Sequence, residues 1–132
     1  MNGILIDTTL LVAYERGRFD LTAFFKAHPD TPFAMSAVTV SELWHGVERA
    51  DAARKKVRTA AVETLLDIIE ILDFTEDIAR EHAHIWATLE KAGERIGAHD
   101  MMIAATATTY GYALATFNTK EFKRVPGLSI LF

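Results

Sequence analysis

The sequence contains no cysteine, and this absence excludes several classes of protein. A disulfide-linked fold, a thiolate metal site and a cysteine nucleophile are all impossible, so any metal ion must be held by oxygen or imidazole ligands. Long hydrophobic runs are missing too: no apolar stretch approaches the roughly 20 residues of a membrane-spanning helix, and residues 1–7 lack the basic start and long apolar region of a signal peptide. We expect a cytoplasmic protein with no membrane partner.

Excess positive charge is also absent, because 18 acidic residues outnumber 14 basic ones and leave a formal net charge of -4. Binding to nucleic acid would therefore depend on a local basic patch rather than on overall attraction. The composition itself is ordinary for a globular protein, with 50% hydrophobic and 24% charged residues. A chain of 132 residues can bury its own core, so we expect a single domain over residues 1–132.

Short apolar segments alternate along the chain with segments of helical spacing. This alternation predicts an α/β domain whose mostly parallel sheet is covered by helices on both faces. Asp20 and Thr75 are predicted to cap helices, and Gly111 is predicted to end one. The predicted strands are residues 3–6, 33–35, 69–74, 112–116 and 128–131, and the predicted helices are 10–14, 20–27, 38–50, 51–67, 75–93, 101–110 and 118–122, of which 38–50 and 51–67 would form a hairpin.

Acidic residues recur where these strands end or where helices begin. Asp7 follows the first strand, and Glu42 and Asp100 lie in the first turns of later helices. Each has a structural explanation: Asp7 could cap a helix, Thr39 and Glu42 have the spacing of a capping box, and Asp100 suits the positive end of a helix. For any one of these residues alone, a structural role is favoured over a catalytic one. Together, at one edge of a parallel sheet, their carboxylates could instead converge on a hard cation such as Mg²⁺.

Four blocks stand in order along the chain: ILIDTTLLV at 4–12, VSELWHGV at 40–47, IGAHDMMIAA at 96–105 and TFNTKEF at 116–122. In sequence, order and separation they resemble PIN domains, and FKRVPGL at 122–128 is similar to the ending of many VapC toxins. The resemblance implies a three-layer α/β/α domain with a central, mostly parallel sheet of four to five strands. It also implies Mg²⁺- or Mn²⁺-dependent cleavage of RNA, a homodimer and a VapB-like antitoxin that blocks the site.

By matching positions, the resemblance makes Asp7, Glu42 and Asp100 the metal-binding acids and places Thr8 near the metal or its waters. The fourth acidic position of many relatives falls at Asn118, which has a neutral carbonyl oxygen but no charge to offer. Glu121, about one helical turn later, could supply the missing carboxylate. We weigh Asn118 and Glu121 equally, and we do not expect a firmly held second metal ion.

The chemistry implied by these acids is hydrolysis, in which a water activated at the metal attacks a phosphodiester in line and leaves a 3′-hydroxyl and a 5′-phosphate. Basic residues would have to bind the phosphates. The cluster at 54–58 either steers RNA or forms a solvated helix face. Lys120, Lys123 and Arg124 lie nearer to the expected site in sequence, and we favour them as phosphate contacts.

Two other functions stay open at this point. In the first, the chain is a non-catalytic interaction module, its acidic helix starts are only caps, and its apolar surface serves oligomerisation. In the second, it is a PIN-like nuclease that acts on DNA or on structured nucleic acid. Metal titration separates the first from catalysis, and a comparison of RNA with matched DNA separates the second.

Overall fold

The computed structural model describes residues 1–132 and contains one five-stranded sheet in the order β3-β2-β1-β4-β5. Every neighbouring pair of strands is parallel, so all five carboxyl ends lie at the same edge. The chain leaves the central strand β1 towards β2 and β3, and later returns to place β4 on the other side of β1. This reversal puts the topological switch point between β1 and β4, where open parallel sheets bind their ligands. The strands are β1 (Ile4–Ile6), β2 (Phe33–Ser36), β3 (Glu70–Leu72), β4 (Ala113–Ala115) and β5 (Ile130–Leu131).

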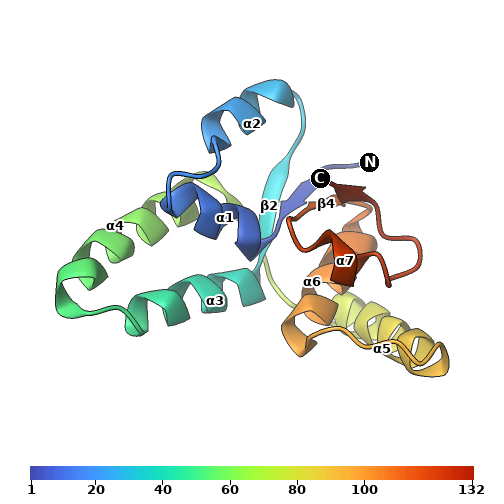
Figure 1. Ribbon diagram of the computed structural model, residues 1–132. Helices are drawn as coiled ribbons and strands as arrows, with labels where there is room; N and C mark the ends of the chain where they lie inside the picture. Colours follow the sequence, from blue (N-terminus) through green and yellow to red (C-terminus); the bar gives the residue numbers. More distant parts are fainter.

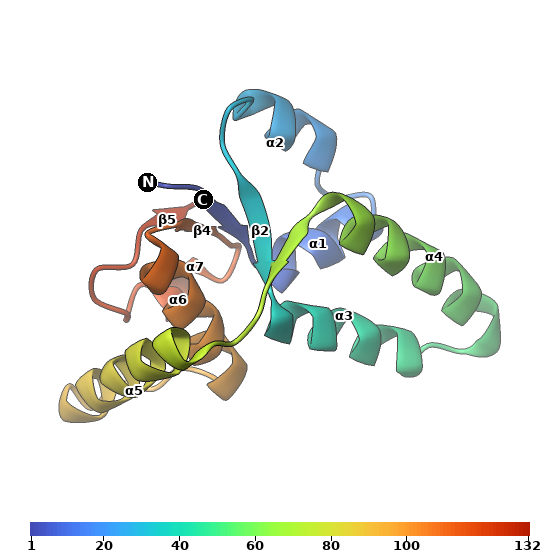
Figure 2. The same cartoon turned by 180° about the vertical axis from the view of Figure 1, so that it is seen from behind.

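Helices cover both faces of the sheet, as the sequence predicts. Seen from the front in Figure 1 and from behind in Figure 2, α1 to α4 lie on one side of the strands and α5 to α7 on the other. None of the helices is both long and apolar enough to span a membrane. The helices are α1 (Thr8–Glu15), α2 (Leu21–Ala27), α3 (Ala37–Glu48), α4 (Ala52–Ile68), α5 (Glu76–Lys91), α6 (Ala98–Tyr110) and α7 (Thr119–Phe122).

Two apolar cores, one on each face, hold the three layers together. Successive residues of a strand point to opposite faces, and β1 follows this rule: Ile4 and Ile6 belong to the core shared with α1 to α4, whereas Leu5 belongs to the core shared with α5 to α7. All three β1 side chains have 0% exposure. The residue after Ile6 is therefore held by a strand that is packed on both sides.

The predicted element order is confirmed, including the hairpin of α3 and α4 (Figure 1). Asp20 and Thr75 cap α2 and α5 as predicted, accepting the backbone N–H of Ala23 and of Ile78. Gly111 ends α6 with a φ of 68°, a left-handed conformation that glycine adopts without strain. Several boundaries differ from the predicted ones by two or three residues. The difference that bears on the site is that α6 begins at Ala98 rather than Met101, so Asp100 lies inside the first helical turn.

Candidate active site

The switch point gathers the three predicted acids at one cavity. Asp7 directly follows β1, Glu42 lies on the second turn of α3, and Asp100 lies on the first turn of α6. All three line a cavity of about 420 Å³, together with Thr8 and Asn118. Residues far apart in sequence meet here because β1 and β4 are neighbours and because α3 and α6 both begin at the carboxyl edge of the sheet.

Asp7 does not cap α1. The residue occupies the N-cap position, but its carboxylate accepts no backbone N–H of that helix. Instead, Oδ2 accepts the hydroxyl of Thr9 at 2.8 Å and the hydroxyl of Thr116 at 2.7 Å. Asp7 is only 2% exposed, and hydrogen bonds of this kind offset the cost of burying a carboxylate. Because both bonds fall on Oδ2, Oδ1 remains for a ligand.

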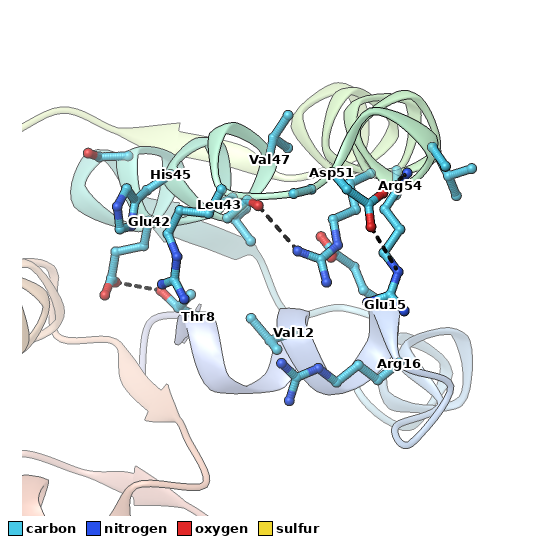
Figure 3. A pocket seen from close by; sticks show the side chains of 18 of the residues that line it. Thr8, Val12, Glu15, Arg16, Glu42, Leu43, His45, Val47, Asp51 and Arg54 are labelled. Carbon is cyan, nitrogen blue, oxygen red and sulfur yellow. Dashed lines mark hydrogen bonds and ion pairs between the residues drawn. The ribbon is translucent and has the colours of Figure 1, made fainter.

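Glu42 does not form the capping box that its spacing from Thr39 suggests. The α3 cap is Ser36, whose hydroxyl accepts the backbone N–H of Val38 at 3.2 Å. Glu42 lies further along the helix, and its Oε1 accepts the hydroxyl of Thr8 at 2.7 Å (Figure 3). Its Oε2 lies 3.7 Å from Nδ1 of His99, just before Asp100. Glu42 therefore links the starts of α1 and α6 across the cavity.

Asp100 experiences the crowding of these carboxylates most strongly. Burial raises its pKa to about 7, and the negative charges of Asp7, Glu121 and Glu42 add to the rise, while His99 opposes it. A carboxyl whose charge is disfavoured by burial and by like charges is stabilised in its ionised form when a cation lies nearby. The electrostatics at Asp100 therefore favour a bound cation.

Asn118 and Glu121 lie next to Asp100 but are engaged with each other. Glu121 accepts the amide of Asn118 at 3.0 Å and the backbone N–H of Gly97 at 2.6 Å, and these hydrogen bonds lower its pKa. Asn118 also donates to Oδ2 of Asp100, at 3.4 Å. Asn118 and Glu121 also have the spacing of a capping box, but Asn118 makes no side-chain cap of α7. Glu121 thus holds the start of α6, and Asn118 bridges two carboxylates.

Two arginines that no sequence pattern singles out line the same cavity. Arg16 and Arg18 lie in the turn between α1 and α2, on either side of Gly17, and both are exposed and make no ion pair. The local signal was an Arg-Gly-Arg turn in an acidic chain. Only the fold shows that this turn comes back beside Asp7 and Asp100, so pattern alone could not assign it.

The basic residues favoured from sequence are placed differently. Arg124 pairs with Glu94 at 3.4 Å and donates to the backbone carbonyl of Arg95, so its guanidinium holds the loop before α6. Lys120 and Lys123 are exposed and make no ion pair. None of the three lines the acidic cavity, and their contact with phosphate stays a prediction.

A larger groove of about 1180 Å³ runs from the acidic site between α1, α3 and α4. Figure 3 shows Thr8 and Glu42 at one end and the Asp51–Arg54 pair at the other, with Val12 of α1 below Leu43 of α3. The 54–58 cluster is partly engaged here: Arg54 pairs with Asp51 at 3.9 Å, and Arg58 donates to the carbonyl of Gly46 at 3.2 Å. The groove thus combines apolar walls with arginines.

The donor set at the acidic site suits Mg²⁺ or Mn²⁺, since it consists of carboxylate, hydroxyl and amide oxygens. As the side chains stand, no group of three His, Cys, Asp or Glu residues is arranged to enclose a metal ion. Mg²⁺ is commonly bound through one or two carboxylates, with waters and phosphate oxygens completing its shell. The residues present fit that mode of binding, and the repulsion at Asp100 is what such a cation would relieve.

Comparison with known proteins agrees with this geometry. The PIN domain family matches residues 4–128 of the chain. Ribonuclease VapC1 of Rickettsia felis is 37% identical over 130 residues, covering 98% of this chain and 95% of the relative. A tRNA(fMet)-specific endonuclease VapC of Salmonella typhimurium is 34% identical over 96 residues, covering 73% of this chain and 71% of the relative.

Solved structures agree over almost the whole fold. DNA-bound VapBC from Salmonella typhimurium superposes with a TM-score of 0.90 at 28% identity, covering 99% of this chain and 98% of that chain. VapBC2 from Rickettsia felis, bound to a DNA fragment from their promoter, gives a TM-score of 0.89 at 26% identity and covers 97% and 96% of the two chains. The similarity therefore includes every strand and helix that builds the acidic cavity.

Proposed function

The chain belongs to the PIN-domain family and, within it, to the VapC ribonucleases, and from this premise we propose that it is a toxin endoribonuclease neutralised by a VapB-like antitoxin. The reaction is hydrolysis of RNA phosphodiester bonds. The observation that carries the proposal is the gathering of Asp7, Glu42 and Asp100 at the switch point of a parallel sheet, in one cavity. RNA as substrate is consistent with action in the cytoplasm. We also propose that the protein is a homodimer, for which light scattering would give a mass twice the 14.7 kDa of one chain.

The proposed cofactor is Mg²⁺ or Mn²⁺, held by Asp7, Glu42 and Asp100, with Asn118 or Glu121 at the edge of its shell. When bound, such a cation polarises a phosphoryl oxygen and makes a water easier to deprotonate. The chain's own residues prepare the site. Thr9 and Thr116 fix one oxygen of Asp7, and Thr8 orients Glu42. Arg16 and Arg18 offer guanidinium groups to the substrate phosphates.

Cleavage by the purified chain is expected to require the cation and to be selective for RNA. A single-stranded RNA should be cut in Mg²⁺ or Mn²⁺ and left intact in EDTA, because three carboxylates alone repel a phosphodiester. The matched DNA should remain uncut. Mapping of the ends should show a 3′-hydroxyl and a 5′-phosphate, since water rather than the 2′-hydroxyl is the proposed nucleophile.

Each arm of this experiment has an outcome that contradicts the proposal. Undiminished cleavage in EDTA would show that the reaction does not require a metal ion. A 2′,3′-cyclic phosphate as the primary product would mean attack by the ribose itself. Cleavage of DNA as fast as RNA would favour the alternative of a DNA-directed nuclease, and binding of RNA without cleavage in any cation would favour an interaction module.

The antitoxin is proposed to occupy the groove of Figure 3. An amphipathic helix binds by placing its apolar face in a hydrophobic groove, and Val12, Ala53 and Val57 offer accessible apolar surface in this groove, with arginines beside them. Because the groove ends at Thr8 and Glu42, a segment lying in it would also cover the acidic site. The relatives solved as VapBC complexes support a VapB-like partner.

Val57→Glu should weaken binding of the cognate antitoxin about tenfold or more, because it places a charge where an apolar contact would be buried. Val57 lines the groove and is 70% exposed in the chain alone, so the substitution should leave the fold unchanged. Ile68→Glu is the matched control, since Ile68 is 60% exposed on the same helix but lies outside the groove. Calorimetric titration of both variants measures the difference, and equal weakening in both would contradict this location.

A further inference from the structure

An exposed phenylalanine, Phe117, stands at the rim of the acidic cavity. It follows β4 and immediately precedes Asn118, and its side chain is 48% exposed. Phe117 lines the cavity together with Asp7, Asp100 and Arg18. The exposed surface of the ring lies at the rim of the cavity, where a ligand with a flat apolar face can stack on it.

The ring is held in a fixed relation to Asp7. The backbone N–H of Phe117 donates to the hydroxyl of Thr9 at 3.1 Å, and that hydroxyl donates to Oδ2 of Asp7 at 2.8 Å. On one side the ring packs edge-on against Phe19, with centroids 5.6 Å apart at 80°, and it meets Phe132 at 5.5 Å. One threonine thus ties the backbone of Phe117 to the predicted metal ligand, and two neighbouring rings support the Phe117 ring from the side.

Charges around the ring complete a set of complementary groups. Arg16 and Arg18 line the same cavity with unpaired guanidinium groups, and Asp7 and Asp100 provide the negative side. The volume of about 420 Å³ is in the range of ligand sites, about 300–1,000 Å³. A nucleotide has a flat base for the ring and a phosphate for the arginines, whereas an apolar peptide side chain would leave the arginines and carboxylates without partners.

We propose that Phe117 is the platform on which a base next to the scissile phosphate stacks, while Arg18 binds an adjoining phosphate. Such stacking requires an unstacked base, as in a loop or a single strand. A base inside an A-form duplex stays stacked on its neighbours and cannot reach the ring, which is why RNA loops and ends are the usual targets of aromatic side chains. This inference rests on the proposed ribonuclease function and assigns the residues of the same site that bind the base and the adjoining phosphate.

The test compares Phe117→Ala, Phe117→Tyr and the control Tyr110→Ala in the full chain. Tyr110 is an exposed aromatic at the end of α6, far along the helix from Asp100. Loss of one base–aromatic stack should raise KM for a single-stranded RNA by about 5- to 100-fold, with a smaller change in kcat because Asp7 keeps its partners. Phe117→Tyr should restore KM to near the wild-type value, and Tyr110→Ala should not change it.

An RNA that lacks the base on one side of the cleavage site gives the readout that a purely structural role would not change. The KM of the wild type should rise by the same factor on this abasic RNA as it does in Phe117→Ala on the intact RNA. The KM of Phe117→Ala should be the same for the abasic and the intact RNA. Wild type should also cleave the RNA poorly when it is annealed to its complement.

The following results would overturn the inference while leaving the ribonuclease function intact: a wild-type KM in Phe117→Ala, undiminished sensitivity of that variant to the abasic RNA, or equal cleavage of the annealed RNA. Loss of antitoxin binding in Phe117→Ala with unchanged RNA cleavage would assign the ring to a protein interface and overturn it as well. A wild-type chain that cleaves no RNA would contradict the proposed function itself.

Discussion

Asp7→Asn should lower kcat for RNA cleavage about a hundred- to a thousandfold, the loss typical of removing one preorganised electrostatic group from an active site. The protein should stay folded. Asp7 is buried, and the two hydroxyls of Thr9 and Thr116 that bond its carboxylate find the same acceptor in the carbonyl oxygen of asparagine. What disappears is the negative charge that the cation requires.

Single-turnover cleavage and thermal unfolding of the same preparation separate these two effects. Asp30→Asn is the matched control, because Asp30 is an exposed aspartate in the loop that leads into β2, at the opposite edge of the sheet. It should have wild-type activity. If Asp7→Asn stayed folded and cleaved RNA at the wild-type rate, Asp7 would not be the metal ligand that its position suggests.

The fold follows from the sequence in outline because strand and helix periods alternate along the chain. Residues 3–6 and 112–116 are recognisable as strands, and β1 and β4 are found there. The sequence does not reveal that β1 and β4 are neighbours in the sheet, since strands of three residues carry no pairing signal beyond apolarity. The position of the site depends on that pairing, which brings Thr116 within 2.7 Å of Asp7.

The capping patterns show where local reasoning fails. Thr39 and Glu42 have the spacing of a capping box, but α3 begins earlier, because Ser36 at the end of β2 already provides the cap. Ser36 and Thr39 both have a hydroxyl that can cap a helix, and the point at which β2 ends decides which of them caps α3. Glu42 is thereby free to accept the hydroxyl of Thr8. The Arg-Gly-Arg turn is the converse case, since its proximity to the carboxylates appears only in three dimensions.

Asp100→Asn is expected to abolish cleavage and, in the absence of a cation, to stabilise the protein. In EDTA the folded state holds the Asp100 carboxyl at a pKa of about 7, above its ordinary value of 3.8. A folded state with a raised carboxyl pKa binds more protons than the unfolded state between those two values, so wild-type stability falls as pH rises from about 4 to 7 and then levels off. Asparagine carries no charge and avoids this loss.

The gain should therefore be largest above pH 7 and should vanish below about pH 4. Because Asp100 is only partly buried, solvent screening reduces the effect, and we expect about 1–2 kcal/mol, or roughly 5 °C in Tm. Mg²⁺ should raise the Tm of wild type and have a smaller effect on the variant, since ligand binding to the folded state stabilises it in proportion to occupancy. Thermal unfolding at pH 5 and pH 8, with EDTA and with Mg²⁺, measures all of these differences.

Asp77→Asn makes this experiment decisive, because Asp77 also lies in the first turn of a helix, α5, but outside the acidic cavity. A carboxylate there interacts favourably with the positive end of the helix, so its removal should destabilise the protein by a few tenths of a kcal/mol to about 1 kcal/mol. If Asp100 served only the same purpose at the start of α6, Asp100→Asn would destabilise the protein too. Opposite signs for the two substitutions in EDTA at pH 8 would show that Asp100 is held in its place against repulsion from Asp7, Glu121 and Glu42, as a cation site requires.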